Sequence, residues 1–139
     1  MKAARFCALS TVGHESQPQT RIIDPLEPAP DFTVYFATNP RSRKVAELRR
    51  NSRVALLYFD AAGRRTVGLI GRATEISGTE KRAHHKPDWE AFFPIAKPDE
   101  YVLYRVDASR LEVVSASDGF SGDPSTWRPE IVDLKPTKN

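Results

Sequence analysis

Short segments rich in β-branched and aromatic residues recur along this chain, and turn-forming residues separate them. Such segments favour strands, and several of them at short spacing are typical of an all-β barrel or sandwich. The apolar run at 53–59 predicts a strand that is buried on both faces. Glycines at 68 and 71 predict a bulge, a barrel corner or the close approach of another backbone. We expect strands over residues 6–12, 17–24, 32–38, 53–59, 65–76, 101–106 and 110–115.

One helix start is well marked, directly after the third expected strand. Asn39 can cap a helix, and Pro40 suits the first helical position because its missing N–H costs nothing there. Val45 and Leu48 are three residues apart and share a face, whereas the rest of the segment is polar. We expect a surface helix that ends near Arg50 and buries a thin apolar stripe. Short helices are also expected around 80–83 and 89–93.

Length and composition restrict the possible classes of protein. A chain of 139 residues fits one domain, so we expect a single domain over residues 1–139. The net charge of +3 is too small to indicate nucleic acid, although it is compatible with a small anionic ligand. Cys7 is the only cysteine, which excludes an intrachain disulfide and a cysteine-based zinc site. We find no membrane-spanning apolar run and no signal peptide, and therefore expect a cytoplasmic protein.

The adjacent histidines, His84 and His85, are candidate metal or haem ligands. Neighbouring residues point to opposite faces of a strand and lie about 100° apart on a helix, so such a pair rarely binds one ion. We interpret the pair as part of an exposed loop and expect no metal site.

Polar groups gather in two segments where an expected strand meets a turn, 21–24 and 37–44. The second segment places a hydroxyl and several cations on the first turn of the helix, where free N–H groups favour an anion. Cations at this end oppose the helix dipole, so their presence indicates a resident anion rather than a solvated basic surface. Each charge-assisted hydrogen bond contributes about 1.5–3 kcal/mol, and three or four would hold a phosphate monoester.

These segments resemble a known family. Residues 35–48 run from an aromatic strand ending in Ala-Thr into a Ser-Arg-Lys helix start, and they resemble the FMN-phosphate segment of the pyridoxamine 5'-phosphate oxidase family. Segments 18–23, 51–56 and 65–74 resemble further family strands in the same order. The resemblance, to the general stress protein 26-like branch, implies a mainly β split barrel of six to seven strands with short helices. It also implies a homodimer that holds FMN between its subunits.

The family pattern assigns expected roles by position. Arg21 and Lys44 are expected to bind the FMN phosphate, with Ser42 and Arg43 assisting. Thr66 stands where many relatives place a glutamine from the partner subunit. The residues expected to line the isoalloxazine ring are Ile22, Ile23, Asp24, Ala37 and Thr38. Trp127 and Arg128 are expected to correspond to a C-terminal segment that closes over the flavin, or else Trp127 anchors the tail to the dimer surface.

The chain departs from authentic pyridoxamine phosphate oxidases at three places. It lacks their lysine at 24–26 and their Arg-x-His at 127–130, and the segment 81–88 replaces their substrate-phosphate segment. We therefore do not expect the vitamin B6 reaction. The resemblance implies an FMN-dependent oxidoreductase that transfers two electrons between a small-molecule redox substrate and an acceptor, with catalytic residues unassigned.

Other functions remain open from the sequence. Deazaflavin F420 would use the same basic helix start as FMN. A non-catalytic flavin- or F420-binding or sensing module is the alternative from a different class. A barrel that binds single-stranded nucleic acid needs exposed aromatics beside its cations, whereas most aromatics here have core spacing. Relatives usually begin with a helix, but here the first strand starts near Phe6, so that helix is either missing or lost to a wrong start site.

Overall fold

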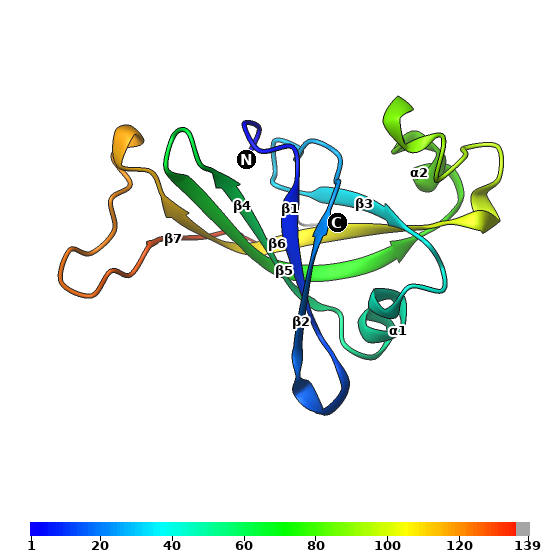
Figure 1. The fold of residues 1–139 in the computed structure, drawn as a ribbon, viewed down its shortest axis with the longest axis horizontal. Coiled ribbons are helices and arrows are strands. Elements are labelled where there is room, and N and C mark those ends of the chain that lie inside the picture. The colour runs from blue at the N-terminus through cyan, green and yellow to red at the C-terminus, as the bar shows by residue number, and fades with distance from the viewer. Residues whose placement is uncertain (136–139) are drawn as a thin grey trace.

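The computed structural model describes residues 1–135 as a strongly curled antiparallel sheet with small helices at its margins (Figure 1). Residues 136–139 of the expected domain lie outside the described residues. The helices are α1 (Arg43–Arg50) and α2 (Gly78–Ala83), and single 3₁₀ turns occur at 14–16, 87–89, 98–100 and 116–118. The strands are β1 (Cys7–Val12), β2 (Pro18–Ile23), β3 (Val34–Thr38), β4 (Arg53–Asp60), β5 (Arg65–Ile76), β6 (Val102–Val114) and β7 (Glu130–Asp133).

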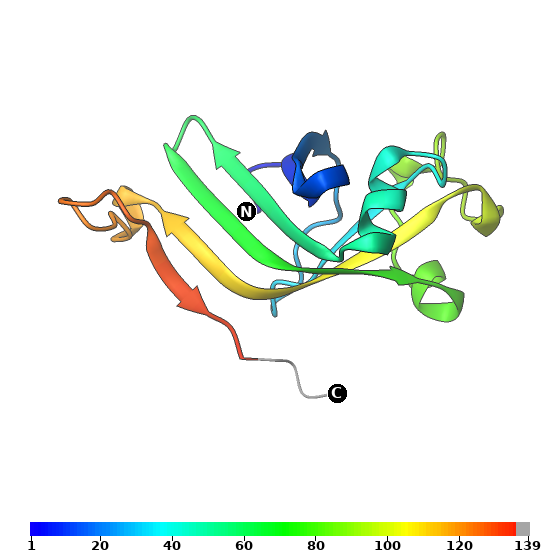
Figure 2. The same ribbon diagram turned by 90° about the horizontal axis from the view of Figure 1, so that it is seen from below.

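The sheet is a barrel that stays open between its two end strands. The strand order is β2-β1-β4-β5-β6-β3, and β7 pairs with the far part of β6. The curvature is clearest in Figure 2, where β4, β5 and β6 bend together along their length. No ladder joins β2 to β3 within residues 1–135, but the backbone N–H of Leu26 donates to the carbonyl of Tyr35 (2.8 Å). The expected split barrel is confirmed.

A row of leucines forms the centre of the core. Leu9, Leu56, Leu69 and Leu111 lie opposite one another on β1, β4, β5 and β6, and all four are buried. Residues directly opposite in antiparallel strands share a face, so the row marks the inner side of the sheet. Burying each leucine contributes about 1.5–3 kcal/mol. The alternation of the strands thus builds the barrel around one leucine layer.

The outer side of β4 corrects one prediction. Leu57 and Phe59 are 49% and 60% exposed, so the strand is not buried on both faces. An apolar run specifies two apolar faces, but within residues 1–135 no second layer covers Leu57 and Phe59 on the outer face. This leaves large apolar side chains on the surface, and we return to them below.

The predicted break between two late strands is also wrong. β6 runs unbroken from Val102 to Val114 because β5 pairs with it along the whole length, and a bulge between Ile70 and Gly71 absorbs the irregularity. A side chain at Gly71 would collide with the backbone carbonyl of Asp107, which explains the glycine and confirms the predicted bulge. The sequence did not predict the short strand β7. All four of its residues are exposed.

The helix α1 begins three residues later than predicted. Asn39 does not cap it: its side-chain oxygen accepts from the backbone N–H of Arg41 (2.8 Å), and its carbonyl accepts from that of Ser42 (3.0 Å). Residues 39–42 therefore form a turn, and Ser42 occupies the N-cap position. Val45 and Leu48 are buried as predicted.

A second apolar cluster lies under α2 and the loop after it. Trp89 is buried in this cluster, at the end of the 3₁₀ turn at 87–89. The histidine pair is not an exposed loop. His84 stacks on Tyr35 with ring centroids 3.8 Å apart, and the His85 Nε2 lies 2.7 Å from the carbonyl of Phe93. No helix among residues 1–135 is long and apolar enough to cross a membrane.

Candidate functional site

Three of the predicted phosphate-site residues, and one residue predicted to line the flavin ring, converge at one end of the split. Arg21 comes from β2, Thr38 ends β3, Ser42 precedes α1, and Lys44 lies in its first turn. The Lys44 Nζ donates to the Thr38 Oγ1 (2.9 Å), which also lies 3.1 Å from the Ser42 Oγ. The first backbone N–H groups of α1 have no intrahelical acceptor. Two strand ends and a helix start therefore present donors to one place.

Arg21 is held on the inner side of the sheet by a buried carboxylate. Its Nη2 donates to the Glu47 Oε2 (2.8 Å) and its Nη1 to the Thr11 Oγ1 (2.6 Å), and the Thr11 hydroxyl donates to the same Glu47 oxygen (2.5 Å). The Glu47 side chain is 8% exposed. Sequence reasoning missed Glu47, although a carboxylate beside Leu48 on the buried stripe of the helix was an available signal.

The charges of the site are coupled. Burial and the nearby Arg21 charge lower the pKa of Lys44, and the Glu47 carboxylate partly opposes this. Burial would raise the pKa of Glu47, but hydrogen bonds from Thr11 and Arg21 outweigh it, so the pKa falls. Arg43 is exposed beside them and has no carboxylate within 4.0 Å among residues 1–135. Three cations face one carboxylate, a balance that suits an added dianion.

The β2 edge continues away from this cluster through Ile22 and Ile23. The Ile22 side chain is 68% exposed on the outer side, whereas Ile23 is buried in the core. Since β2 is an end strand, the backbone groups on its outer edge have no ladder partner. On the opposite end strand, Ala37 is half-buried and packs against the second apolar cluster.

Asp24 is engaged by cations at the far end of this edge. Its carboxylate accepts from Lys86 (2.6 Å) and from Arg5 (3.0 Å), and its carbonyl accepts from the indole of Trp89 (3.1 Å). Burial would raise the pKa of Asp24, but these ion-paired hydrogen bonds outweigh it and lower the pKa. The carboxylate and the backbone carbonyl of Asp24 therefore both have partners within the chain.

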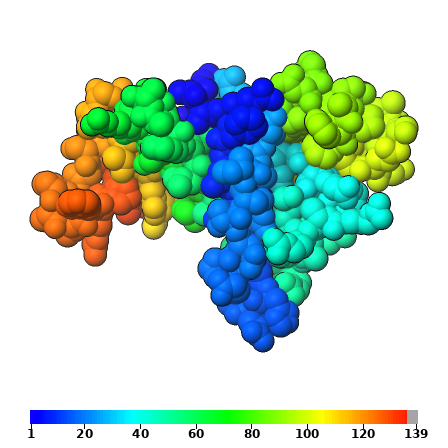
Figure 3. Space-filling view, viewed as in Figure 1, coloured from blue at the N-terminus to red at the C-terminus, as the bar shows by residue number. Residues whose placement is uncertain are grey.

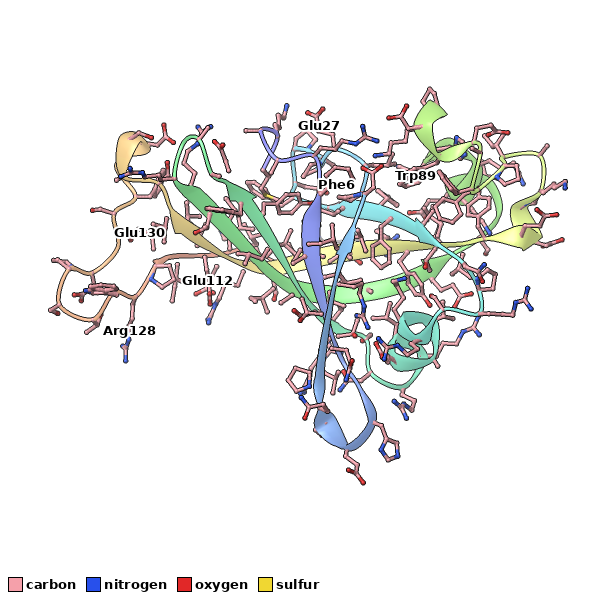
Figure 4. All side chains as sticks on the ribbon, viewed as in Figure 1. Phe6, Glu27, Trp89, Glu112, Arg128 and Glu130 are labelled. Atoms are coloured by element: carbon pink, nitrogen blue, oxygen red, sulfur yellow. The ribbon has the colours of Figure 1, made fainter. Side chains whose placement is uncertain are left out.

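The other three predicted residues do not join this cluster within one chain. Thr66 lies on the outer face of β5, directly opposite Phe59. Trp127 is 89% exposed in the loop before β7. Arg128 lies in the same loop, at the opposite end of the molecule from α1 (Figure 4). Their roles at a flavin remain predictions.

These features define a class of protein: a split barrel whose opening carries a cationic helix start. A family model described as pyridoxamine 5'-phosphate oxidase matches residues 1–115, and the chain belongs to this family. A pyridoxine/pyridoxamine 5'-phosphate oxidase from Thermosynechococcus vestitus is 36% identical over 76 residues, which cover 55% of this chain. The matched segment spans only 36% of that relative's length.

Solved structures share the fold at low sequence identity. A Clostridium acetobutylicum protein related to general stress protein 26 has a TM-score of 0.77 at 15% identity, covering 96% of this chain and 88% of that one. General stress protein 26 from Bacillus anthracis has a TM-score of 0.72 at 20% identity, with 94% and 90% covered. A pyridoxamine 5'-phosphate oxidase-related, FMN-binding protein from Nostoc punctiforme has a TM-score of 0.66 at 13% identity, with 95% and 87% covered.

Proposed function

We propose that this chain is a flavoprotein that binds FMN across the split between β2 and β3. The observation that carries the proposal is the convergence of Arg21, Lys44, Thr38 and Ser42 at the start of α1. The side chains of Arg21, Arg43 and Lys44 carry three positive charges, and the Glu47 carboxylate carries one negative charge. The cluster therefore has a net charge of two, which matches a phosphate dianion. Family membership and the FMN-binding relative from Nostoc support the same ligand.

The edges of β2 and β3 suit the isoalloxazine ring. Ile22 offers an exposed apolar side chain beside the split, and Ala37 offers a small one on the opposite strand. The outward backbone groups at the end of β2, at Ile22 and Ile23, have no ladder partner and can pair with the polar edge of the ring. FMN supplies two-electron redox chemistry when bound, while the protein positions it. Ala37, Thr38 and residues 22–24 are the proposed ring contacts.

A second copy of the chain completes the site in this proposal. The outer face of the sheet carries an apolar band of exposed Phe6, Ile22, Leu57, Phe59 and Ile70. Ile22 and Leu57 lie in one cross-strand row through the small Ala8. Large exposed apolar patches mark association surfaces. Figure 3 shows that the β1–β2 hairpin and the loop before β7 project from the body of the molecule, where each can reach a neighbour.

In that dimer, Thr66 on the apolar band and the projecting Trp127 and Arg128 of one chain approach the flavin of the other. The proposed activity is that of an FMN-dependent oxidoreductase with a small-molecule redox substrate. The alternative is a non-catalytic module that binds flavin or F420. The pairing of Asp24 with two cations favours this alternative, because it engages a carboxylate that could otherwise act as an acid or base.

An absorption spectrum between 350 and 500 nm tests the proposal. Purified protein, mixed with FMN and desalted, should retain the flavin bands, and Arg21→Ala/Lys44→Ala should lose them. Arg110→Ala is the control, since Arg110 pairs with Asp133 on the exposed end of β6. Protein that keeps no FMN would refute the flavin site. With FMN bound, consumption of NADH or NADPH favours the enzyme, and no turnover with either donor favours the module.

A further inference from the structure

Charged and polar side chains form two neighbouring rows on the outer face of the sheet. Arg53, Arg72 and Asp107 lie opposite one another on β4, β5 and β6. Two residues along, Arg105 of β6 lies opposite Tyr35 of β3. The residues that alternate with them face the core, so all five side chains point away from it.

These rows line a hollow on the surface of the sheet, which we call the arginine groove. Its volume is about 820 Å³, within the range of about 300–1,000 Å³ typical of small-molecule sites. His84, stacked on Tyr35, forms one wall, and the bulged backbone at Gly71 forms part of the floor. Bulges occur preferentially next to binding sites, where they redirect side chains. Neither Arg21 nor Lys44 lines the groove, so it is separate from the proposed phosphate site, although Ile70 of the outer apolar band is among its lining residues.

The charges in the groove are unevenly matched. Arg105 is neutralised by Glu80 (3.1 Å) and Asp107 (3.0 Å). Arg53 and Arg72 lie directly opposite each other, and neither has a carboxylate within 4.0 Å in the described part of the chain. Arg72 donates to the hydroxyl of Ser52 (3.1 Å).

Like charges directly opposite across an antiparallel pair destabilise a sheet. An anion bound between the two guanidiniums would remove that repulsion. Guanidinium groups match phosphate and carboxylate oxygens through paired hydrogen bonds. The groove is far larger than a lone phosphate, so it has room for an organic body beside the anionic group.

We propose that the arginine groove binds a small organic anion, with its phosphate or carboxylate between Arg53 and Arg72. The body of the ligand lies against the wall formed by Tyr35 and His84. The Nδ1 of His84 lies 2.8 Å from the carbonyl of Glu80 and donates to it. The other ring nitrogen, Nε2, takes no part in this hydrogen bond. The chain therefore carries a second ligand site, distinct from the split.

Isothermal titration calorimetry with AMP, citrate and inorganic phosphate tests this site, with FMN present in excess. We expect AMP or citrate to bind once per chain and more tightly than inorganic phosphate. AMP binding alone assigns a phosphate ligand, and citrate binding alone assigns a carboxylate ligand. Arg53→Gln/Arg72→Gln should weaken binding roughly tenfold or more, because each change removes a charge-assisted hydrogen bond. Arg110→Gln, which changes an exposed arginine outside the groove, should leave binding unchanged.

Three results would overturn the proposal. The first is no binding of AMP or citrate at about 10 mM, a concentration that detects even weak sites. The second is equal binding of AMP or citrate by the wild type and by Arg53→Gln/Arg72→Gln, when circular dichroism shows that both proteins are folded. The third is loss of AMP binding in Arg21→Ala/Lys44→Ala, which would assign the anion to the split.

Discussion

Replacing Glu47 by glutamine removes one negative charge from the centre of the proposed phosphate site and keeps the shape of the side chain. The Glu47 carboxylate accepts hydrogen bonds from Thr11 and Arg21. A hydrogen bond to a charged group contributes about 1.5–3 kcal/mol, against about 0.5–1.5 kcal/mol for a neutral pair. The Thr11 bond loses that difference, and the Arg21 bond loses its ion-pair attraction, so the free energy of unfolding falls by about 2–3 kcal/mol.

Urea denaturation at pH 7 measures this change, and Glu75→Gln is the matched control. Glu75 pairs with Arg49 at 3.0 Å, but both side chains are exposed, so its replacement should cost less than about 1 kcal/mol. Equal losses for the two variants would refute the argument that burial makes the Glu47 pair strong.

The pH dependence provides a second check on Glu47. Its pKa is lower in the folded protein than in the unfolded chain, so the carboxylate stabilises the fold above its unfolded pKa. This contribution is lost as the pH falls through the folded pKa. The difference between wild type and Glu47→Gln should therefore be constant near neutral pH and shrink in acid below the ordinary glutamate range. A difference that stays constant in acid would contradict the assignment.

Three other predictions follow from single contacts. Lys44→Ala should weaken FMN binding roughly tenfold or more but leave riboflavin binding unchanged, because riboflavin lacks the phosphate; fluorescence titration measures both. Leu57→Asp, which puts a charge on the outer apolar band, should convert a dimer to a monomer in size-exclusion chromatography, and an unchanged elution would exclude this face as the interface. Gly71→Ala should lower the free energy of unfolding by about 1–3 kcal/mol because its Cβ meets the Asp107 carbonyl. Gly68→Ala, where the nearest atom is 3.6 Å away, should cost much less in the same urea experiment.

The sequence alone determined the features that contiguous residues encode. The strand-forming residues of each segment placed β1 to β5, because a strand can be recognised from its own side chains. The segment 37–44 gave the anion site in the same way, since a strand end, a turn and a helix start are consecutive in the chain. Arg21 was assigned to that site only through the resemblance to a family, and the fold brings it beside α1.

The tertiary structure decided what depends on distant partners. Glu47 is buried because β1 and β2 supply Thr11 and Arg21 to it, and nothing in the helix itself specifies that pairing. Asp24 is paired because Lys86 folds back over it from a segment 62 residues away. The continuity of β6 depends on the long ladder with β5, which overrides the polar residues at its middle.

The same reason explains the surface features. The outward side chains Leu57 and Phe59 of β4 would read the same in the sequence whether or not a second layer covered them. Only the tertiary structure shows that they are exposed. Arg53 and Arg72 are 19 residues apart in the chain, and only the register of β4 with β5 makes them neighbours. Local patterns report backbone conformation, whereas burial and pairing of charges depend on which strands the fold brings together.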